Sequence, residues 1–191
     1  MRVIVGISGA SGAIYGWRLL ERLRDQPDVE SHLVITRSAE RTLHMETGKK
    51  PADLKSLAHH CYPIDDIGAA LASGSFQTDG MVVAPCSIHT MSAIAAGVTS
   101  NLLLRAADVT LKERRRLVLM VRETPFHLGH LRTMVALTEM GAIVAPPIPA
   151  FYFKPQTIED LVDHSVDRVL DLLGLPPGNA DNARRWPPEA S

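Results

Sequence analysis

The chain of 191 residues is 46% hydrophobic and 21% charged, which is ordinary for a folded domain and excludes disordered, collagen-like and coiled-coil classes. Its 20 Lys and Arg nearly balance 21 Asp and Glu. The resulting net charge of −1 argues against a dedicated nucleic-acid or membrane-surface binder, which would be basic.

Cysteine usage and the apolar runs set further limits. The two cysteines, Cys61 and Cys86, cannot build a disulfide framework, and no Cys/His group has the spacing of a zinc site. No apolar run approaches the roughly 20 residues of a membrane helix, and no signal peptide is expected. We therefore expect a cytoplasmic protein with neither nucleic-acid nor membrane partners. Composition shifts after Gly174, so we expect one domain over residues 1–175 and a C-terminal arm over residues 176–191.

Short apolar runs alternate with longer segments of helical period, which predicts an α/β fold with a mainly parallel sheet. The expected strands are Val3–Val5, His32–Ile35, Met81–Ala84 (ended by Pro85), Leu117–Val121 and Ile143–Ala145. The expected helices are Tyr15–Leu23, a segment through Leu43 and Met45, a short helix around Leu54–His60, Thr90–Ala96, Leu102–Glu113, Leu128–Met140 and Ile158–Leu173.

Parallel sheets bind ligands at the carboxyl ends of their strands, so the segments that follow strands are the candidates for a site. The first is the loop GISGASG at Gly6–Gly12, whose glycines and following helix N-terminus suit an anion. Its spacing matches neither the dinucleotide fingerprint nor the Walker pattern, and the second strand leads into Thr36 rather than an acid. A tight turn and a phosphate cradle both remain open, and a mononucleotide fits better than NAD.

The second candidate segment is Pro85–Thr90. Ser87 and Thr90 are three residues apart at a helix start, so their hydroxyls and the first backbone N–H groups can converge on one phosphate. An ordinary helix cap is the alternative. We expect His89 to be a surface or supporting residue and Cys86 to be a packed apolar side chain.

Two further segments carry charged pairs. Arg122 and Glu123 leave the fourth predicted strand, where they could bind phosphate and move a proton, or form a structural ion pair. Arg105 and Lys112 are seven residues apart on one predicted helix, with Asp108 between them, so a solvated salt-bridged stripe is the alternative to a site.

The last candidate segment, residues 146–155, holds four prolines and three adjacent aromatic residues. Such a stiff loop can wall an apolar pocket or bury itself in an oligomer contact. Arg168 follows on the next predicted helix, and Glu46 follows the second. Together these residues suggest a substrate with an anionic end and an apolar body.

Five motifs in order resemble those of the UbiX-type flavin prenyltransferases, a branch of the homo-oligomeric flavin-containing cysteine decarboxylase superfamily. The resemblance runs from Met1 to about Leu175 and includes the RRW at Arg184–Trp186. The motifs are GISGASG at Gly6–Gly12, PCSIHT at Pro85–Thr90, RAADVTLKERRRLVL at Arg105–Leu119, RETP at Arg122–Pro125 and PPIPAFY at Pro146–Tyr152. The resemblance implies a three-layer, Rossmann-like or flavodoxin-like α/β fold.

The resemblance also implies site residues. The positions that would bind FMN are Gly9, Ala10, Ser11, Thr36, Ser87, Thr90 and Arg122. The positions that would hold the phosphate of dimethylallyl phosphate are Tyr152 and Arg168, with Arg105 and Lys112 from a neighbouring subunit. Glu46 and Glu123 match positions that serve prenyl transfer and proton handling, with Ser11 aiding Glu123.

By the same resemblance, the reaction transfers dimethylallyl from its phosphate to N5 and C6 of reduced FMN. The product, prenylated FMN, would serve a UbiD-type decarboxylase. The family uses no metal and builds dodecamers from trimers.

The chain departs from the family at Thr36, usually Ser, at His89, usually Lys, and over residues 96–101. Two alternatives stay open: an FMN-dependent decarboxylase of aromatic or cysteinyl acids, and a flavin carrier that has lost catalysis. Carbon dioxide release without a partner enzyme would distinguish the first.

Overall fold

The computed structural model describes residues 1–175, which form an α/β fold around one sheet. The strand order is β3-β2-β1-β4-β5-β6, and every neighbouring pair is parallel. This is the strand order of a doubly wound Rossmann sheet, so the predicted class is confirmed. The strands are β1 (Arg2–Ile7), β2 (Glu30–Ile35), β3 (His60–Tyr62), β4 (Gly80–Cys86), β5 (Arg116–Val121) and β6 (Ile143–Val144).

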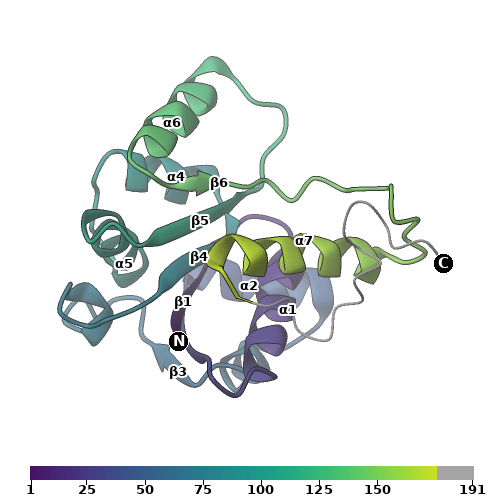
Figure 1. The fold of residues 1–191 in the computed structure, drawn as a ribbon, viewed down its shortest axis with the longest axis horizontal. Coiled ribbons are helices and arrows are strands. Elements are labelled where there is room, and N and C mark those ends of the chain that lie inside the picture. The colour runs from purple at the N-terminus through teal and green to yellow at the C-terminus, as the bar shows by residue number, and fades with distance from the viewer. Residues whose placement is uncertain (176–191) are drawn as a thin grey trace.

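Helices cover both faces of the sheet and give three layers (Figure 1). The central strands are nearly continuous apolar runs because both of their faces are buried. One apolar core lies under α1 (Ala13–Arg24), α2 (Arg37–Thr47), α3 (Pro51–Lys55) and α7 (Ile158–Leu173). The other lies under α4 (Ile88–Ala95), α5 (Leu102–Lys112), α6 (Leu128–Glu139) and the short 3₁₀ turn Ala70–Ala72.

Two local expectations were wrong. The helix expected around Leu54–His60 ends earlier, at Lys55, and His60 begins the edge strand β3, whose polar residues give no apolar run. Pro85 does not end its strand, because β4 continues to Cys86. The pairing with β5 shifts register between Val83 and Cys86, and such an irregularity tolerates a residue without an N–H group.

Helix α6 stands away from the rest of the chain and contacts mainly α4 and β6 (Figure 1). Leu128, Leu131 and Val135 lie three and four residues apart and are 59%, 46% and 58% exposed. This spacing places them on one face of the helix. A single copy of the chain therefore presents an apolar helix face to solvent.

The expected C-terminal arm, with Arg184–Trp186, lies outside the described residues. Within residues 1–175, none of the helices combines the length and apolarity that crossing a bilayer requires.

Candidate functional site

The carboxyl ends of β1 and β4 meet at the point where the chain order of the sheet reverses, which is where open α/β sheets bind ligands. A cavity of about 350 Å³ lies there, within the roughly 300–1,000 Å³ of small-molecule sites. We call it the β1/β4 hollow. It is lined by Ser8, Gly9, Thr36, Ser38, Ser87, His89, Thr90, Asn101, Leu103 and Leu104.

Three helices begin at the β1/β4 hollow. Thr36, Ser87 and Asn101 cap α2, α4 and α5, and their side-chain oxygens accept hydrogen bonds from Ala39 N, Thr90 N and Leu104 N at 3.1, 3.2 and 3.0 Å. Helix N-termini carry partial positive charge and leave first-turn N–H groups available. None of the described lining residues is acidic. The hollow is therefore suited to an anion such as a phosphate.

Ser87 both caps a helix and lines the hollow, so the cap and the predicted phosphate site are compatible. Its hydroxyl caps α4 and also donates to the Thr90 hydroxyl at 3.1 Å, while both residues line the hollow. Ser8 holds the two strand ends together: its buried hydroxyl donates to Pro85 O at 3.0 Å and accepts from Ser87 N at 2.7 Å. Sequence reasoning missed Ser8 because a serine in a glycine loop is an unspecific signal.

The glycine loop contributes to the hollow through Gly9. A Cβ atom at Gly9 would lie 2.4 Å from the Ser38 hydroxyl, so only glycine fits without moving that side chain. The hydroxyls of Ser38 and Thr36 are themselves 3.1 Å apart. The residues present thus form a hydroxyl-lined cradle that fits the phosphate end of a mononucleotide such as FMN. Ala10 and Ser11 follow in the loop but are not among its lining residues.

The N-terminus of α1 differs from the expectation of a free anion site. Glu46, at the end of α2, reaches across, and one of its carboxylate oxygens accepts from Gly12 N and Ala13 N at 2.9 and 3.1 Å. Gly12 has φ +96°, which favours glycine. The chain's own carboxylate occupies this helix end, which leaves the β1/β4 hollow as the place for a ligand phosphate. The sequence separation of 34 residues between Gly12 and Glu46 hid this contact from sequence reasoning.

Arg122 and Glu123 follow β5, next to the end of β4. Arg122 N donates to Cys86 O at 3.0 Å, and Glu123 Oε1 accepts from Thr124 N at 2.9 Å. Within the described residues neither side chain forms a salt bridge, so the structural ion pair considered from the sequence is absent. Cys86 is fully buried, and burial raises the pKa of its thiol, which agrees with a packed apolar role.

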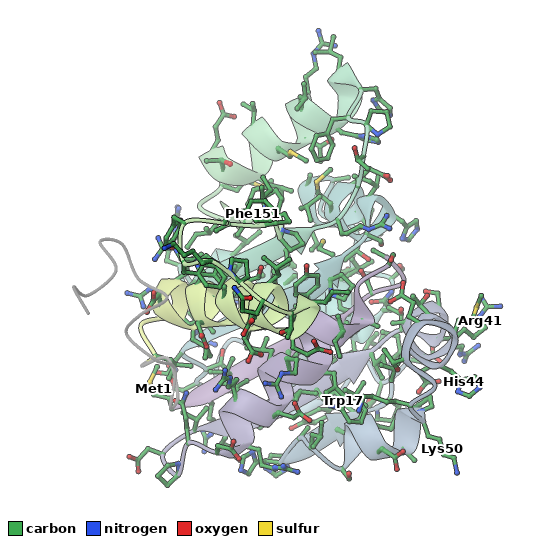
Figure 2. All side chains as sticks on the ribbon, turned by 90° about the vertical axis from the view of Figure 1, so that its right-hand side faces the viewer. Met1, Trp17, Arg41, His44, Lys50 and Phe151 are labelled. Atoms are coloured by element: carbon green, nitrogen blue, oxygen red, sulfur yellow. The ribbon has the colours of Figure 1, made fainter. Side chains whose placement is uncertain are left out.

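The proline-rich segment after β6 runs between α6 and α7, with Phe151 on the α7 side (Figures 1 and 2). The Tyr152 hydroxyl lies 2.8 Å from His164 Nε2 on α7, and the Phe153 ring stacks on His164 with centroids 4.8 Å apart. Arg168 is one turn after His164 on the same helix, so the structure brings Tyr152 and Arg168 to one face of α7. No motif pointed to His164.

Arg105 and Lys112 do not reach the hollow of their own chain. Helix α5 starts at the hollow and leads away from it, and Lys112 is 11 residues past its cap, or about 16 Å along the axis. Arg105 Nη1 pairs with Asp108 Oδ2 at 2.7 Å, and Lys112 pairs with Glu113. Within one chain these residues form the salt-bridged stripe that the sequence left as an alternative.

Comparisons with known proteins show the family of the chain. Residues 1–170 match the Flavoprotein family. The chain is 55% identical over 186 residues to the flavin prenyltransferase UbiX of Thauera aromatica, covering 97% of this chain and 94% of the relative. It is 56% identical over 174 residues to the enzyme of the same name from Escherichia coli K12, covering 91% and 92%. The chain belongs to the UbiX flavin prenyltransferase family.

Solved structures of the UbiX family have the same fold. A structure described as a dodecameric FMN-dependent UbiX-like decarboxylase from Escherichia coli O157:H7 superposes with a TM-score of 0.94 at 47% identity, covering 97% of this chain and 99% of that one. A structure of AnUbiX with FMN and dimethylallyl pyrophosphate superposes with a TM-score of 0.93 at 48% identity, covering 97% and 96%.

Proposed function

We propose that the chain is a flavin prenyltransferase that joins the dimethylallyl group of dimethylallyl phosphate to N5 and C6 of reduced FMN. The observation that carries the proposal is the β1/β4 hollow, where three helix N-termini and a set of hydroxyls converge in a member of the UbiX family. The relative solved with FMN and dimethylallyl pyrophosphate supports a flavin and a phosphorylated dimethylallyl donor as the substrates.

In this proposal the hollow holds FMN. The hydroxyls of Thr36, Ser87 and Thr90 and the N-termini of α2 and α4 bind the phosphate, and Gly9 lets the backbone approach the ligand closely. Ala10, Ser11 and Arg122 bind the remainder of the molecule. FMN is then both the bound flavin and the acceptor of the prenyl group.

The prenyl donor binds between α7 and the proline-rich segment. Tyr152, oriented by His164, and Arg168 hold the phosphate, and Arg105 and Lys112 of a neighbouring subunit complete its neutralisation. Phosphate leaves when the C–O bond of the donor breaks, so cationic groups must stabilise the negative charge that develops on it. The aromatic side chains of the segment face the positive charge that develops on the allyl group.

Bond formation at C6 releases one proton, and Glu123 is the proposed base. It lies at the carboxyl end of β5, beside the strand whose end leads to Ser87. Ser11 assists this transfer, and Glu46 serves prenyl transfer from the N-terminus of α1. Proton transfer by a positioned carboxylate contributes on the order of 10²–10⁴ to a rate.

We also propose an oligomeric state and a cellular location for the enzyme. The apolar face of α6 supports assembly with other copies, as a dodecamer built from trimers, and two free cysteines are compatible with the reducing cytoplasm. Residues 1–175 form the catalytic domain. A UbiD-type decarboxylase receives the prenylated FMN.

Mass analysis of the flavin after anaerobic incubation with FMN, reductant and dimethylallyl phosphate tests the proposal. We expect the mass of FMN plus one prenyl group, and unmodified FMN when the donor is omitted. Unmodified flavin in the full mixture, with FMN bound, would support a carrier. Carbon dioxide release from an aromatic or cysteinyl acid without a partner enzyme would support a decarboxylase.

A further inference from the structure

Three side chains that the proposed function does not use meet at the β3 edge of the sheet. Glu30 and His32 lie on β2, and His60 lies on β3, where it pairs with His32 in the parallel register. Residues paired in this way, and residues two apart on a strand, point to the same face of a sheet. One ligand atom from each of the three side chains lies within 4.8 Å of the others. Strand pairing, rather than any sequence spacing, creates this group.

His32 supplies the observation that this group is more than a surface cluster. The residue is 1% exposed, and its Nδ1 lies 3.0 Å from the Tyr62 hydroxyl. Its Nε2 is buried, has no hydrogen-bond partner among the described residues, and lies 3.8 Å from Glu30 Oε1. A buried polar atom without a partner is costly, so this position favours a partner from outside the chain. A neutral ring that donates from Nδ1 to the Tyr62 hydroxyl leaves a lone pair on Nε2.

Glu30 is fixed by partners on both of its oxygens. Oε2 accepts from Arg2 Nε at 2.9 Å, and Oε1 lies 2.6 Å from His60 Nε2. These two contacts hold the carboxylate in place between Arg2 and His60. Arg2, which binds Oε2, therefore fixes the orientation of Glu30, and Oε1 faces both imidazole rings. The side chains of His60 and Glu30 are 49% and 38% exposed, so an ion can reach the group from solvent on their side.

We propose that Glu30, His32 and His60 bind one divalent first-row metal ion of the zinc class. Two imidazole nitrogens and one carboxylate oxygen are a common protein ligand set for Zn²⁺, with a water in the fourth position. Metal–ligand bonds of about 2.0–2.1 Å require ligand atoms roughly 3.3 Å apart. The rings of His32 and His60 are stacked, with centroids 4.8 Å apart and an interplanar angle of 16°, so metal binding requires the half-exposed His60 ring to turn out of this stack until Nε2 faces the ion. His60 then carries its ring proton on Nδ1, which frees Nε2 for the metal.

The bound metal would join the edge strand β3 to its neighbour β2. Strand β3 has three residues and pairs only with β2, and the site joins these two strands near their amino ends. The β1/β4 hollow lies at the carboxyl ends of the strands. The metal is thus separate from the prenyl transfer, and its test does not depend on that reaction.

Calorimetric titration of the chelator-treated, full-length protein with ZnCl₂ tests the proposal, with CoCl₂ absorption as a second readout of the ligand field. We expect one Zn²⁺ per chain, no binding of MgCl₂, and a melting temperature that rises with Zn²⁺ concentration. His60→Ala removes an exposed ligand without disturbing the core and lowers the Zn²⁺ affinity by at least about tenfold. His44→Ala, on the outer face of α2 (Figure 2), is the matched control and leaves the affinity unchanged.

Two results would overturn the metal site. One is the absence of both binding heat and Co²⁺ absorption bands in the unsubstituted protein, in which case His32 is only a packed ring. The other is Zn²⁺ binding that survives His60→Ala but is lost when His127 and His130, a stacked pair at the start of α6, are both changed to Ala. FMN affinity is measured in the same samples, and we expect His60→Ala to leave it unchanged.

Discussion

The N-termini of α1 and α4 follow neighbouring strands of one sheet, and both come after short Gly- or Ser-containing turns. At α1 the carboxylate of Glu46 takes the backbone N–H groups of Gly12 and Ala13. At α4 the groups that meet are the hydroxyls of Ser87 and Thr90, and within residues 1–175 no acidic side chain lines the cavity. Equivalent helix N-termini in one fold can therefore be occupied by the chain's own carboxylate or remain available to a ligand. The outcome depends on whether a side chain from a distant segment reaches the helix end.

The largest expected effect comes from a residue at neither helix end. Glu123→Gln keeps the shape of the side chain but cannot take a proton, so we expect prenylated FMN to form about 10²-fold or more slowly while FMN affinity stays the same. Time-resolved mass analysis of the flavin measures the rate, and Glu139→Gln on α6 is the control. If Glu123→Gln forms prenylated FMN at an unchanged rate, the base is Glu46, and the N-terminus of α1 is part of the catalytic site.

A second test concerns the donor phosphate, which we place away from both helix ends. Arg168→Ala removes a charged hydrogen-bond donor, and we expect the KM for dimethylallyl phosphate to rise about tenfold or more with a smaller change in kcat. Tyr152→Phe, which also breaks the contact with His164, changes KM in the same direction by less. Arg132→Ala on α6 is the control. A change in FMN affinity of similar size would place Arg168 at the flavin instead.

The open helix end is tested by Ser87→Ala. Loss of the hydroxyl removes a hydrogen bond to a charged group, so we expect the Kd for FMN to rise about tenfold by fluorescence titration. It also removes the α4 cap and lowers the free energy of unfolding by about 1 kcal/mol. Thr157→Ala removes the α7 cap, away from the hollow, so it costs similar stability and leaves FMN binding intact. Equal Kd values in both variants would contradict the assignment of α4 to the phosphate.

The smallest effect on stability and FMN binding is expected at the closed end, the N-terminus of α1. Glu46→Gln removes the charge that faces the α1 N-terminus, and we expect a loss of about 0.3–1 kcal/mol in the free energy of unfolding by denaturant titration. The Kd for FMN phosphate binding in the hollow stays the same. A tenfold change in that Kd would show that the two helix ends share one ligand.

The elements that sequence patterns predicted well are those with local signals. Helix α7 begins and ends where expected, because Thr157 and Asp160 form a capping box and Gly174 ends the helix in a left-handed conformation. The central strands are apolar runs buried on both faces. Strand β3 was missed because His60–Tyr62 is short and polar, and its strand conformation depends on pairing with β2.

The same distinction between local and long-range signals applies to the candidate site. The hydroxyls of Ser87 and Thr90 were expected at a helix start and are found there. The contact of Glu46 with Gly12 and that of His164 with Tyr152 join separate elements, so only the folded chain reveals them. The positions of Arg105 and Lys112 relative to a neighbouring copy lie beyond what one chain's sequence or fold determines.

The exposed face of α6 links two properties of the protein. The short segment that carries Glu123 connects β5 directly to α6, so whatever covers Leu128, Leu131 and Val135 also fixes one end of the segment that holds the proposed base. In an assembly held through this face, we therefore expect a substitution such as Leu131→Asp to loosen the segment of the proposed base as well as the contact between copies.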